Sequence, residues 1–383
     1  MRVLVTGANG FIGKNLQLHL RELGGMESGL EIVPFTREHT EADFPGLLKG
    51  VDWVFHLAGI NRPEDPSEFI TGNAGLTQAL SNAVKESGRK ISVVYTSSIQ
   101  VERDNDYGTS KRAAEDALLD LNQSTGCPVY IYRLPNVFGK WARPNYNSAV
   151  ASFCHNIARN LPVQINNPSA VIQLVHIDDV VASFISLLDG AAQATPFVDV
   201  EPVYQITVGE LSEQLQRFKA TRDNLITEPV GTGLTRALYS TYVSYLPPEN
   251  FTYTVPQHGD ERGVFVEMLK TPDAGQFSFF TAHPGVTRGG HYHHSKTEKF
   301  LVIKGEACFR FRHMLTGEFY ELRTVGDKPE IVETVPGWTH DITNEGDSEL
   351  VCLLWANEIF DRERPDTFAC PVGTEAGIAS TNN

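Results

Sequence analysis

The chain has 383 residues, of which 41% are hydrophobic and 21% charged, as in an ordinary soluble globular protein with room for two cores. Its formal net charge of -15 disfavours nucleic acid and anionic membranes as partners. No apolar run approaches the ~18 residues of a membrane span. The five cysteines form no CxxC pair and the N-terminus lacks a signal-peptide pattern, so we expect reduced thiols and a cytoplasmic protein.

The first predicted strand, 3–5, runs into a glycine-rich turn and then into a helix with regularly spaced leucines. Glycines permit a tight turn and close backbone approach, and the free N–H groups of the new helix can hold a pyrophosphate. In this context the pattern predicts a dinucleotide site rather than a merely tight loop. The residues expected to contact the cofactor here are Gly7, Gly10, Phe11, Ile12 and Gly13.

The second strand, 31–35, indicates which cofactor is used. It is followed by Thr36-Arg37, where an NAD-selective site would place an acidic residue. A cation there favours the 2'-phosphate of NADPH, with a solvated surface arginine as the alternative. The third strand, which begins at Val51, closes beside the expected cofactor on Leu57, Ala58 and Gly59.

The next strand and helix bring three polar side chains together. Tyr107 and Lys111 lie four residues apart on one face of a first helical turn, and Ser98 ends the preceding strand. A nearby ammonium lowers the pKa of a phenol, and a serine hydroxyl can share a carbonyl oxygen with that phenol, which makes a proton donor for ketone reduction. Taken alone, Tyr-x-x-x-Lys occurs by chance in many helices, so two surface residues are the alternative reading.

Strands and helices alternate over this part of the chain, and this pattern predicts a doubly wound parallel sheet of the Rossmann type, an α/β fold. Six motifs in order resemble the extended short-chain dehydrogenase/reductase family, which handles nucleotide sugars. They are Thr6-Gly7-x-x-Gly10-x-x-Gly13, His56-Leu57-Ala58-Gly59, Ser97-Ser98, Tyr107-x-x-x-Lys111, Arg133-x-x-Asn136-Val137-Phe138-Gly139 and His176-Ile177-Asp178-Asp179-Val180.

This resemblance covers about residues 1 to 240 and implies roles for single residues. Ser98 would orient the substrate carbonyl, Tyr107 would donate the proton, and Lys111 would bind the nicotinamide ribose. Asn136 would belong to the substrate site. One departure is the stretch between Ser98 and Tyr107, which has only eight residues where the family usually has more. It either leaves the site more open or becomes ordered only when ligand binds.

The segment 140–148 is the best candidate for the substrate pocket. It supplies cations, a planar aromatic ring and amide donors to an acidic protein that would bind a diphosphate sugar. We expect Lys140 and Arg143 to contact the substrate. The alternative is that Trp141 and Tyr146 pack beneath a surface loop.

A predicted helix at 209–219 precedes Pro247-Pro248, which marks a domain boundary. From Phe251 onwards the hydrophobic periodicity is two, as in an all-β sandwich or barrel. The predicted domains are therefore a reductase domain at 1–246, a β domain at 247–372 and a disordered tail at 373–383.

A set of metal-binding residue types lies in the β domain. His291 and His293 would share one side of a strand, and Glu298 and His340 would arrive on neighbouring strands. Such a mixed nitrogen and oxygen set suits Zn, Ni, Mn or Fe. We expect a bound divalent metal, with zinc as the favoured ion, and the alternative is a set of histidines satisfied by hydrogen bonds. The set resembles the motif of the cupin family, whose fold is a jelly roll, although Pro336-Gly337 replaces Pro-x-Gly.

A second resemblance competes for His291. Residues 260–267 and 288–292 are similar to the deoxysugar nucleotide 3,5-epimerases, in which the corresponding histidine is a base and no metal is used. On that resemblance Arg262 binds substrate. The sequence leaves open whether His291 is ligand or base; the other three ligands alone would leave an open coordination position.

The whole architecture, over about residues 1 to 372, resembles a family of bifunctional capsule and O-antigen enzymes of the CapF type. That resemblance implies a UDP-2-acetamido-2,6-dideoxy-hexos-4-ulose substrate, inversion of C3 in the cupin domain and reduction of C4 by NADPH. The product would be UDP-N-acetyl-6-deoxy-L-talosamine, on the route to N-acetyl-L-fucosamine. A homodimer or dimer of dimers is expected because both family folds usually dimerise.

Two alternatives remain at this point. A 4,6-dehydratase or 4-epimerase of nucleotide sugars would keep NAD bound and recycle it, and Arg37 speaks against this. The second domain could also be a dimerisation module that holds a structural metal and has no chemistry of its own.

Overall fold

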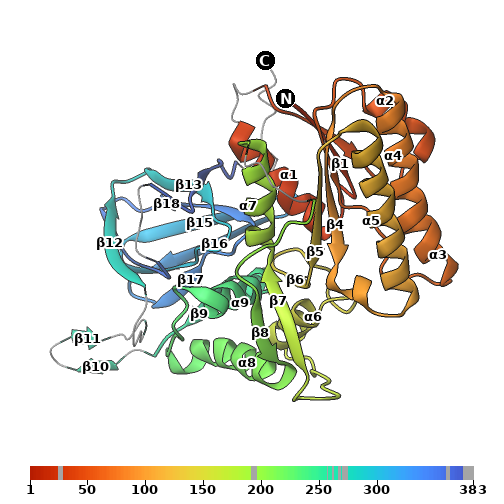
Figure 1. The fold of residues 1–383 in the computed structure, drawn as a ribbon. Helices are drawn as coiled ribbons and strands as arrows, with labels where there is room; N and C mark the ends of the chain where they lie inside the picture. The colour runs from red at the N-terminus through yellow and green to blue at the C-terminus, as the bar shows by residue number, and fades with distance from the viewer. Residues whose placement is uncertain are drawn as a thin grey trace. The chain divides into compact units, whose positions relative to one another are not determined.

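The computed structural model describes residues 1–24, 29–190, 196–256, 258–260, 263–265, 269, 275–358 and 363–373 (Figure 1). The chain divides into two compact units, and each is described by itself. Unit 1 comprises Met1–Phe138, Tyr146–Ser148 and Ile172–Ile206, and unit 2 comprises Gly139–Asn145, Ala149–Val171 and Thr207–Asn383. The domain bounds expected from the sequence stay predictions, and 374–383 of the expected tail lie outside the described residues.

A five-stranded parallel sheet of order β2-β1-β3-β4-β5 forms the centre of unit 1. Its strands are β1 (Arg2–Thr6), β2 (Glu31–Phe35), β3 (Trp53–His56), β4 (Ser92–Ser98) and β5 (Val129–Leu134). Because side chains alternate along a strand, Leu4 packs into one hydrophobic layer while Val3 and Val5 pack into the other. The prediction of a doubly wound parallel sheet is confirmed.

Helices cover both faces of this sheet (Figure 1). On the Leu4 face lie α2 (Phe44–Leu47), α4 (Leu76–Glu86) and α5 (Asp106–Thr125), and on the other face lie α1 (Phe11–Gly24) and α7 (Ile177–Leu188). Shorter helical segments are η1 (Glu41–Asp43), α3 (Ser67–Phe69), η2 (Ile70–Gly75) and η3 (Ile99–Glu102). A small sheet of order β6-β7-β8 consists of β6 (Asn136–Phe138), β7 (Val171–His176) and β8 (Tyr204–Thr207).

Two five-stranded antiparallel sheets dominate unit 2. The first, of order β12-β19-β14-β17-β9, consists of β12 (Gln276–Ala282), β19 (Leu350–Ala356), β14 (Glu298–Lys304), β17 (Glu330–Glu333) and β9 (Thr252–Thr254). The second, of order β16-β15-β18-β13-β20, consists of β16 (Phe319–Val325), β15 (Glu306–His313), β18 (Trp338–Asn344), β13 (Thr287–Tyr292) and β20 (Phe368–Ala369). Phe300 of the first sheet meets Phe309 of the second edge-on, with ring centroids 5.6 Å apart. The predicted all-β region after Phe251 is confirmed.

A separate two-stranded ribbon pairs β10 (His258–Asp260) with β11 (Gly263–Phe265). Unit 2 also contains α6 (Ala149–Ala158), α8 (Val208–Asn224), α9 (Gly233–Ser244) and η4 (Pro248–Asn250). A capping box of Thr207 and Glu210 begins α8, which contains the helix predicted at 209–219. In the part of the chain that the structure describes, every helix is too short or too polar to cross a lipid bilayer.

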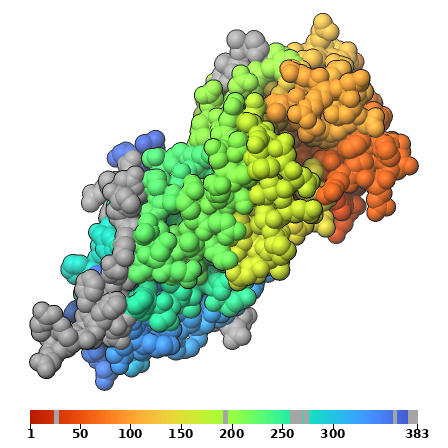
Figure 2. Space-filling model, turned by 90° about the horizontal axis from the view of Figure 1, so that it is seen from below, coloured from red at the N-terminus to blue at the C-terminus, as the bar shows by residue number. Residues whose placement is uncertain are grey.

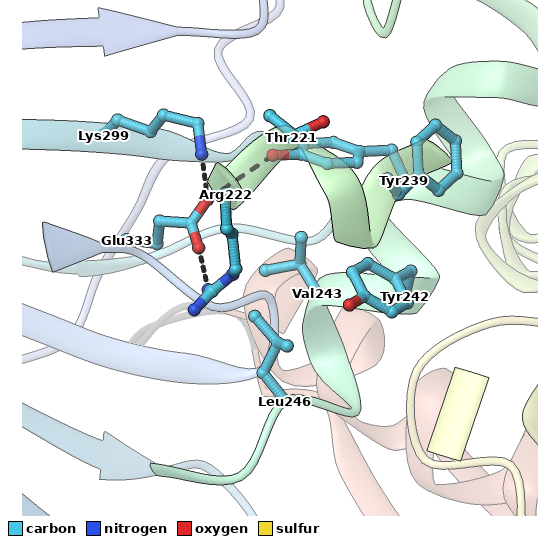
Figure 3. A pocket seen from close by; sticks show the side chains of 9 residues that line it. Thr221, Arg222, Tyr239, Tyr242, Val243, Leu246, Lys299 and Glu333 are labelled. Atoms are coloured by element: carbon cyan, nitrogen blue, oxygen red, sulfur yellow. Dashed lines mark hydrogen bonds and ion pairs between the residues drawn. The ribbon is translucent and has the colours of Figure 1, made fainter. Parts of the chain in front are cut away.

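A buried charge cluster joins α8 to the first antiparallel sheet (Figure 3). Glu333 accepts hydrogen bonds from Arg222 on α8 and from Lys299 on β14. The hydroxyl of Tyr239 on α9 also donates to Glu333, at 3.5 Å. Figure 2 shows the outer surface of this region, where the green surface of the unit 2 helices lies beside the blue surface of its strands.

Candidate functional site

The glycine turn between β1 and α1 has a backbone that larger residues could not adopt. Gly7 has a φ of +66°, and a Cβ built on it would lie 2.8 Å from the Ala58 nitrogen. A Cβ on Gly13 would lie 2.3 Å from the Gly7 oxygen. Without side chains at these positions the turn lies directly against the end of β3, and α1 begins at Phe11, so the first helix amides have no carbonyl partner within the helix. The turn therefore fits the pyrophosphate of a dinucleotide.

A buried histidine network fixes the same corner. The Thr6 hydroxyl oxygen accepts from the amides of Leu57 and Ala58 at 3.1 Å each, and it lies 2.8 Å from His56 Nδ1. His56 Nε2 in turn lies 2.8 Å from the Thr77 hydroxyl. Burial, followed by the charge of Lys111, lowers the pKa of His56 to about 3, so the ring is neutral. The sequence motif contained His56, but its bonding partners could not be read from it.

Ser98, Tyr107 and Lys111 come together at the carboxyl end of β4, as the sequence predicted. Tyr107 makes a side-chain hydrogen bond with Ser98. Lys111 is buried and donates to the Thr96 carbonyl at 2.9 Å. A Cβ on Gly59 would lie 3.2 Å from Lys111 Nζ, so the glycine after β3 leaves the space that this ammonium needs. The three side chains thus face one corner beside the glycine turn.

The pKa of Tyr107 differs from the expectation. Burial raises the pKa of Tyr107, and the hydrogen bond with Ser98 offsets only part of that rise. Lys111 does not control the pKa of Tyr107, because its Nζ bonds to the Thr96 carbonyl and lies 6.0 Å from the Tyr107 ring centroid. Burial also lowers the pKa of Lys111 to about 8, against the opposing charge of Glu115. Tyr107 is therefore a neutral phenol at pH 7, which is the form that can donate a proton.

The short stretch after Ser98 has a defined conformation. Ser98 caps η3 by accepting from the Gln100 amide at 3.2 Å. A Cβ on Gly108 would lie 2.3 Å from the Gln100 oxygen, so the first turn of α5 packs directly against η3. Arg112 donates to the Val101 carbonyl on the same turn. The sequence left open whether this segment makes the site more open or becomes ordered only when ligand binds. The second reading is not needed to explain its conformation.

Glu115 is a buried carboxylate that sequence reasoning missed. It lies one helical turn beyond Lys111, accepts from the Ser97 hydroxyl at 2.5 Å and pairs with Arg133 at 2.7 Å. The carboxylate thereby ties α5 to the ends of β4 and β5 and places a negative charge near Lys111. A glutamate four residues after the lysine was the available signal, but exposed helices carry the same pattern.

The other predicted site residues are less closely organised. Arg37 is exposed just beyond the end of β2, and Phe35 accepts from the Ala8 amide at 3.4 Å. Asn136 is exposed and donates to the Gln173 carbonyl at 3.0 Å. In a different unit, Lys140 is buried and Arg143 is exposed. Arg262 lies outside the described residues.

Trp141 packs against the β-rich part of unit 2. Its ring meets the His313 ring edge-on at 6.2 Å, and a Cβ on Gly337 would lie 2.9 Å from Trp141 Nε1. Lys140 Nζ lies 5.5 Å from the centroid of the same ring. The packing alternative therefore describes Trp141, and Lys140 and Arg143 are the members of this segment that stay proposed as substrate contacts.

The predicted metal ligands converge between the two antiparallel sheets. His291 on β13 pairs in register with His340 on β18, Glu298 begins β14 of the other sheet, and His293 lies just past the end of β13. One ligand atom from each of the four lies within 4.8 Å of all the others. His293, Glu298 and His340 are buried, whereas His291 is partly exposed.

The spacing of these atoms fits a metal centre. Glu298 Oε2 lies 3.0 Å from His293 Nε2 and 3.4 Å from His340 Nε2. Two ligands at about 2.0–2.1 Å from one metal ion lie roughly 2.9–3.4 Å from each other. Burial would raise the pKa of Glu298, but the two histidines hold it well below its usual value, so the residue is a carboxylate. The donor set therefore suits zinc or a similar divalent ion.

The orientation of His293 gives an independent reason to expect a cation. Its Nδ1 lies 2.5 Å from the Asp366 carbonyl oxygen, which can only accept, so Nδ1 carries a hydrogen. In a neutral ring Nε2 is then an acceptor that faces the Glu298 carboxylate. Two acceptors 3.0 Å apart repel unless a cation or a second proton lies between them. Asp366 was not identified from the sequence.

The model of the NAD dependent epimerase/dehydratase family matches residues 3–198, more than half of the chain. The chain belongs to this family. Membership in the NAD dependent epimerase/dehydratase family implies a nicotinamide cofactor. The polysaccharide biosynthesis C-terminal domain matches residues 258–368, which include the four candidate metal ligands.

Two relatives match this chain over nearly its whole length. The UDP-2-acetamido-2,6-beta-L-arabino-hexul-4-ose reductase of Pseudomonas aeruginosa is 65% identical over 376 residues, covering 98% of this chain and 100% of the relative. The capsular polysaccharide assembling protein CapF of Staphylococcus aureus has a TM-score of 0.66 and 39% identity, covering 97% of this chain and 100% of that one. The resemblance to CapF-type enzymes is confirmed. A UDP-glucuronic acid 4-epimerase of Bacillus cereus, at 20% identity, TM-score 0.52 and 57% and 83% coverage, shares the fold alone.

Proposed function

We propose that the protein reduces the C4 ketone of a UDP-linked 2-acetamido-2,6-dideoxy-4-keto-hexose with NADPH, after inverting C3 of the same sugar in its β domain. The observation that carries this proposal is the 65% identity to a UDP-2-acetamido-2,6-beta-L-arabino-hexul-4-ose reductase along the full length of both chains. The arrangement of Ser98, Tyr107 and Lys111 supports the reduction, because it offers a placed phenol beside a dinucleotide turn.

In the reduction, each residue of the first site has a separate task. Ser98 holds the C4 carbonyl oxygen, and Tyr107, a neutral phenol, gives its proton to that oxygen as it becomes a hydroxyl. The buried ammonium of Lys111 holds the nicotinamide ribose and stabilises the phenolate that Tyr107 becomes. NADPH, when bound, supplies the hydride that adds to C4. Arg37 is proposed to contact its 2'-phosphate.

In the epimerisation, a base removes the C3 proton next to the ketone, and a proton returns on the opposite face. His291 is the proposed base because it is the one partly exposed member of the four-residue cluster. His293, Glu298 and His340 would hold the metal, with His291 as the alternative fourth ligand. A divalent ion held there supplies Lewis-acid stabilisation of negative charge on the C4 oxygen.

The two reactions fit one chain because both depend on the same ketone. The C4 carbonyl makes the C3 proton acidic, and reduction then removes the carbonyl and fixes the inverted centre. Epimerisation must therefore precede reduction. The proposed product is UDP-N-acetyl-6-deoxy-L-talosamine, used for capsule or O-antigen synthesis. We further propose that the protein is a cytoplasmic homodimer or dimer of dimers; Asn136, Lys140, Arg143 and Arg262 are the proposed substrate contacts.

Exchange in deuterated water tests the epimerase half. The wild-type protein and the His291→Ala variant are each incubated with the 4-keto substrate without NADPH, beside a sample without protein. We expect the wild type to incorporate deuterium at C3, seen by proton NMR, and the variant to fall to the rate of the protein-free sample. Exchange by the variant at the wild-type rate would exclude His291 as base or essential ligand and favour a non-catalytic second domain.

A further inference from the structure

Asp366 organises the segment that carries one of the proposed metal ligands. Its carboxylate accepts hydrogen bonds from three consecutive backbone amides, those of His294 at 2.8 Å, Ser295 at 2.8 Å and Lys296 at 2.7 Å. The Ser295 hydroxyl adds a fourth at 3.2 Å. A carboxylate that receives three amides fixes the path of a loop far more strongly than one hydrogen bond would. The turn between β13 and β14 is thus built around a single side chain.

The backbone of the same residue contacts the ligand itself. The Asp366 carbonyl accepts from His293 Nδ1 at 2.5 Å, which leaves Nε2 directed at Glu298. A metal-binding histidine needs its other ring nitrogen held in this way, because that bond selects the tautomer and the ring orientation. The side chain of Asp366 therefore places the loop of His293, and its main chain selects the ring nitrogen available for the metal.

A charged network keeps Asp366 in position. The Arg236 guanidinium on α9 lies 4.0 Å from its carboxylate, donates to the Ser295 hydroxyl at 2.8 Å and pairs with Glu358 at 2.7 Å. The Asp366 side chain is only 14% exposed.

We propose that Asp366 is a positioning residue of the metal centre, setting both the tautomer of His293 and the loop on which it lies. This inference rests on the proposed metal site. Asp366→Ala removes the acceptor for three amides, and with it the fixed position of the carbonyl. We expect a zinc affinity about 10–100-fold weaker than that of the wild type, the usual effect of losing such a partner. Asp366→Asn keeps one acceptor oxygen and should have an intermediate effect.

Zinc competition on the full-length protein tests this inference. The wild type and the two variants are titrated with zinc against a chromophoric chelator, and the visible spectrum of each cobalt-loaded protein is recorded. The matched control is Asp327→Asn, an exposed aspartate in a turn of the same unit. The expected order of zinc affinity is wild type and Asp327→Asn together, then Asp366→Asn, then Asp366→Ala, with the cobalt spectrum altered only in the Asp366 variants.

The outcomes separate the proposed metal site from the proposed role of Asp366. A wild type that binds no zinc or cobalt would contradict the proposed metal site itself. A wild type that binds, with Asp366→Ala binding as tightly and giving the same cobalt spectrum, would overturn the role of Asp366 alone. Thermal unfolding of the metal-free proteins distinguishes positioning from general damage. If Asp366→Asn unfolds at the wild-type temperature and still loses affinity, the role is positioning; if its affinity falls only in step with its unfolding temperature, the proposal fails.

Discussion

Tyr107 is a phenol whose protonated state follows from its surroundings. Burial raises its pKa, and Ser98 positions its hydroxyl, so removing that hydroxyl should remove the proton donor and leave the rest of the corner intact. We expect Tyr107→Phe to slow NADPH-dependent reduction by about 10²–10⁴-fold. Deuterium incorporation at C3 should persist, because the proposed epimerisation uses different residues. Parallel assays of NADPH absorbance and NMR exchange measure this, and loss of both activities would argue against two separable sites.

Lys111 gives the reduction a pH dependence with a definite sign. Burial lowers its pKa to about 8, while Glu115 opposes that shift. The ammonium that is proposed to bind ribose and stabilise the phenolate is therefore present below about pH 8 and lost as the pH rises through that value. We expect kcat/KM for reduction, which reports the free enzyme, to decline above about pH 8.

Glu115→Gln should move that decline. Removing the negative charge that supports the Lys111 ammonium lowers the Lys111 pKa further, so the alkaline limb should shift to lower pH. His56 and the ring of Tyr95, 4.8 Å from Lys111 Nζ, also face this ammonium and are unchanged by the substitution. A pH profile of kcat/KM checks the prediction. A limb that stays in place while activity falls evenly at every pH would mean that Glu115 has only a structural role.

The glycine turn at the start of α1 tolerates no side chain where the helix meets the strand. Gly13→Ala places a Cβ 2.3 Å from the Gly7 oxygen, so α1 must move and its amides lose the anion-binding position. We expect NADPH to bind about tenfold or more weakly, measured by fluorescence titration. Gly46→Ala is the matched control, since its Cβ would meet nothing within 4 Å. Equal affinity of the two variants would contradict a cofactor at this turn.

Much of this corner could be predicted from sequence because its constraints are local. The glycine spacing and the strand before it fall within the β1–α1 unit, and the four-residue interval from Tyr107 to Lys111 falls within the β4–α5 unit. Within each such unit periodicity determines geometry. The pKa of Tyr107 could not be predicted, since it depends on how deeply the phenol is buried. Nor could the conformation of the segment after Ser98, which depends on its packing against Gly108.

The candidate metal site could also be predicted only in part from the sequence. The four candidate metal ligands are chemically distinctive residue types, so their pattern was visible in the sequence. Asp366 was not, because it lies 73 positions from His293 and most of its partners are backbone amides, which any residue supplies. Trp141 showed the opposite problem. An aromatic residue among cations suggested a sugar pocket, whereas its ring packs against Gly337 and His313.

At a larger scale, helices and strands from different parts of the chain pack together within unit 2. Arg222, Lys299 and Glu333 form a buried triad at the junction of α8 with the first antiparallel sheet, and Figure 3 shows both cations directed at one carboxylate. The boundary predicted at Pro247 marks the change in hydrophobic periodicity. The triad instead marks a packing contact within unit 2, which includes residues on both sides of Pro247.

Neutralising that carboxylate should destabilise the fold. Glu333→Gln leaves the buried Lys299 and the largely buried Arg222 without their counter-charge, and we expect it to lower the free energy of unfolding by about 3–5 kcal/mol. The control Glu345→Gln breaks an exposed pair with Arg323 and should cost about 0–1 kcal/mol. Urea unfolding followed by circular dichroism compares the two variants. Equal losses would show that the triad contributes nothing beyond a surface pair.

The central claim is that one ketone undergoes both reactions on this chain. The direct measurement is to supply the UDP-linked 2-acetamido-2,6-dideoxy-4-keto-hexose and NADPH to the wild-type protein in deuterated water, and to analyse both cofactor and product. We predict one NADPH consumed per product molecule, with a hydroxyl at C4 and deuterium at C3. No consumption of NADPH with this sugar, or a C4 alcohol that retains its original C3 hydrogen, would contradict the account.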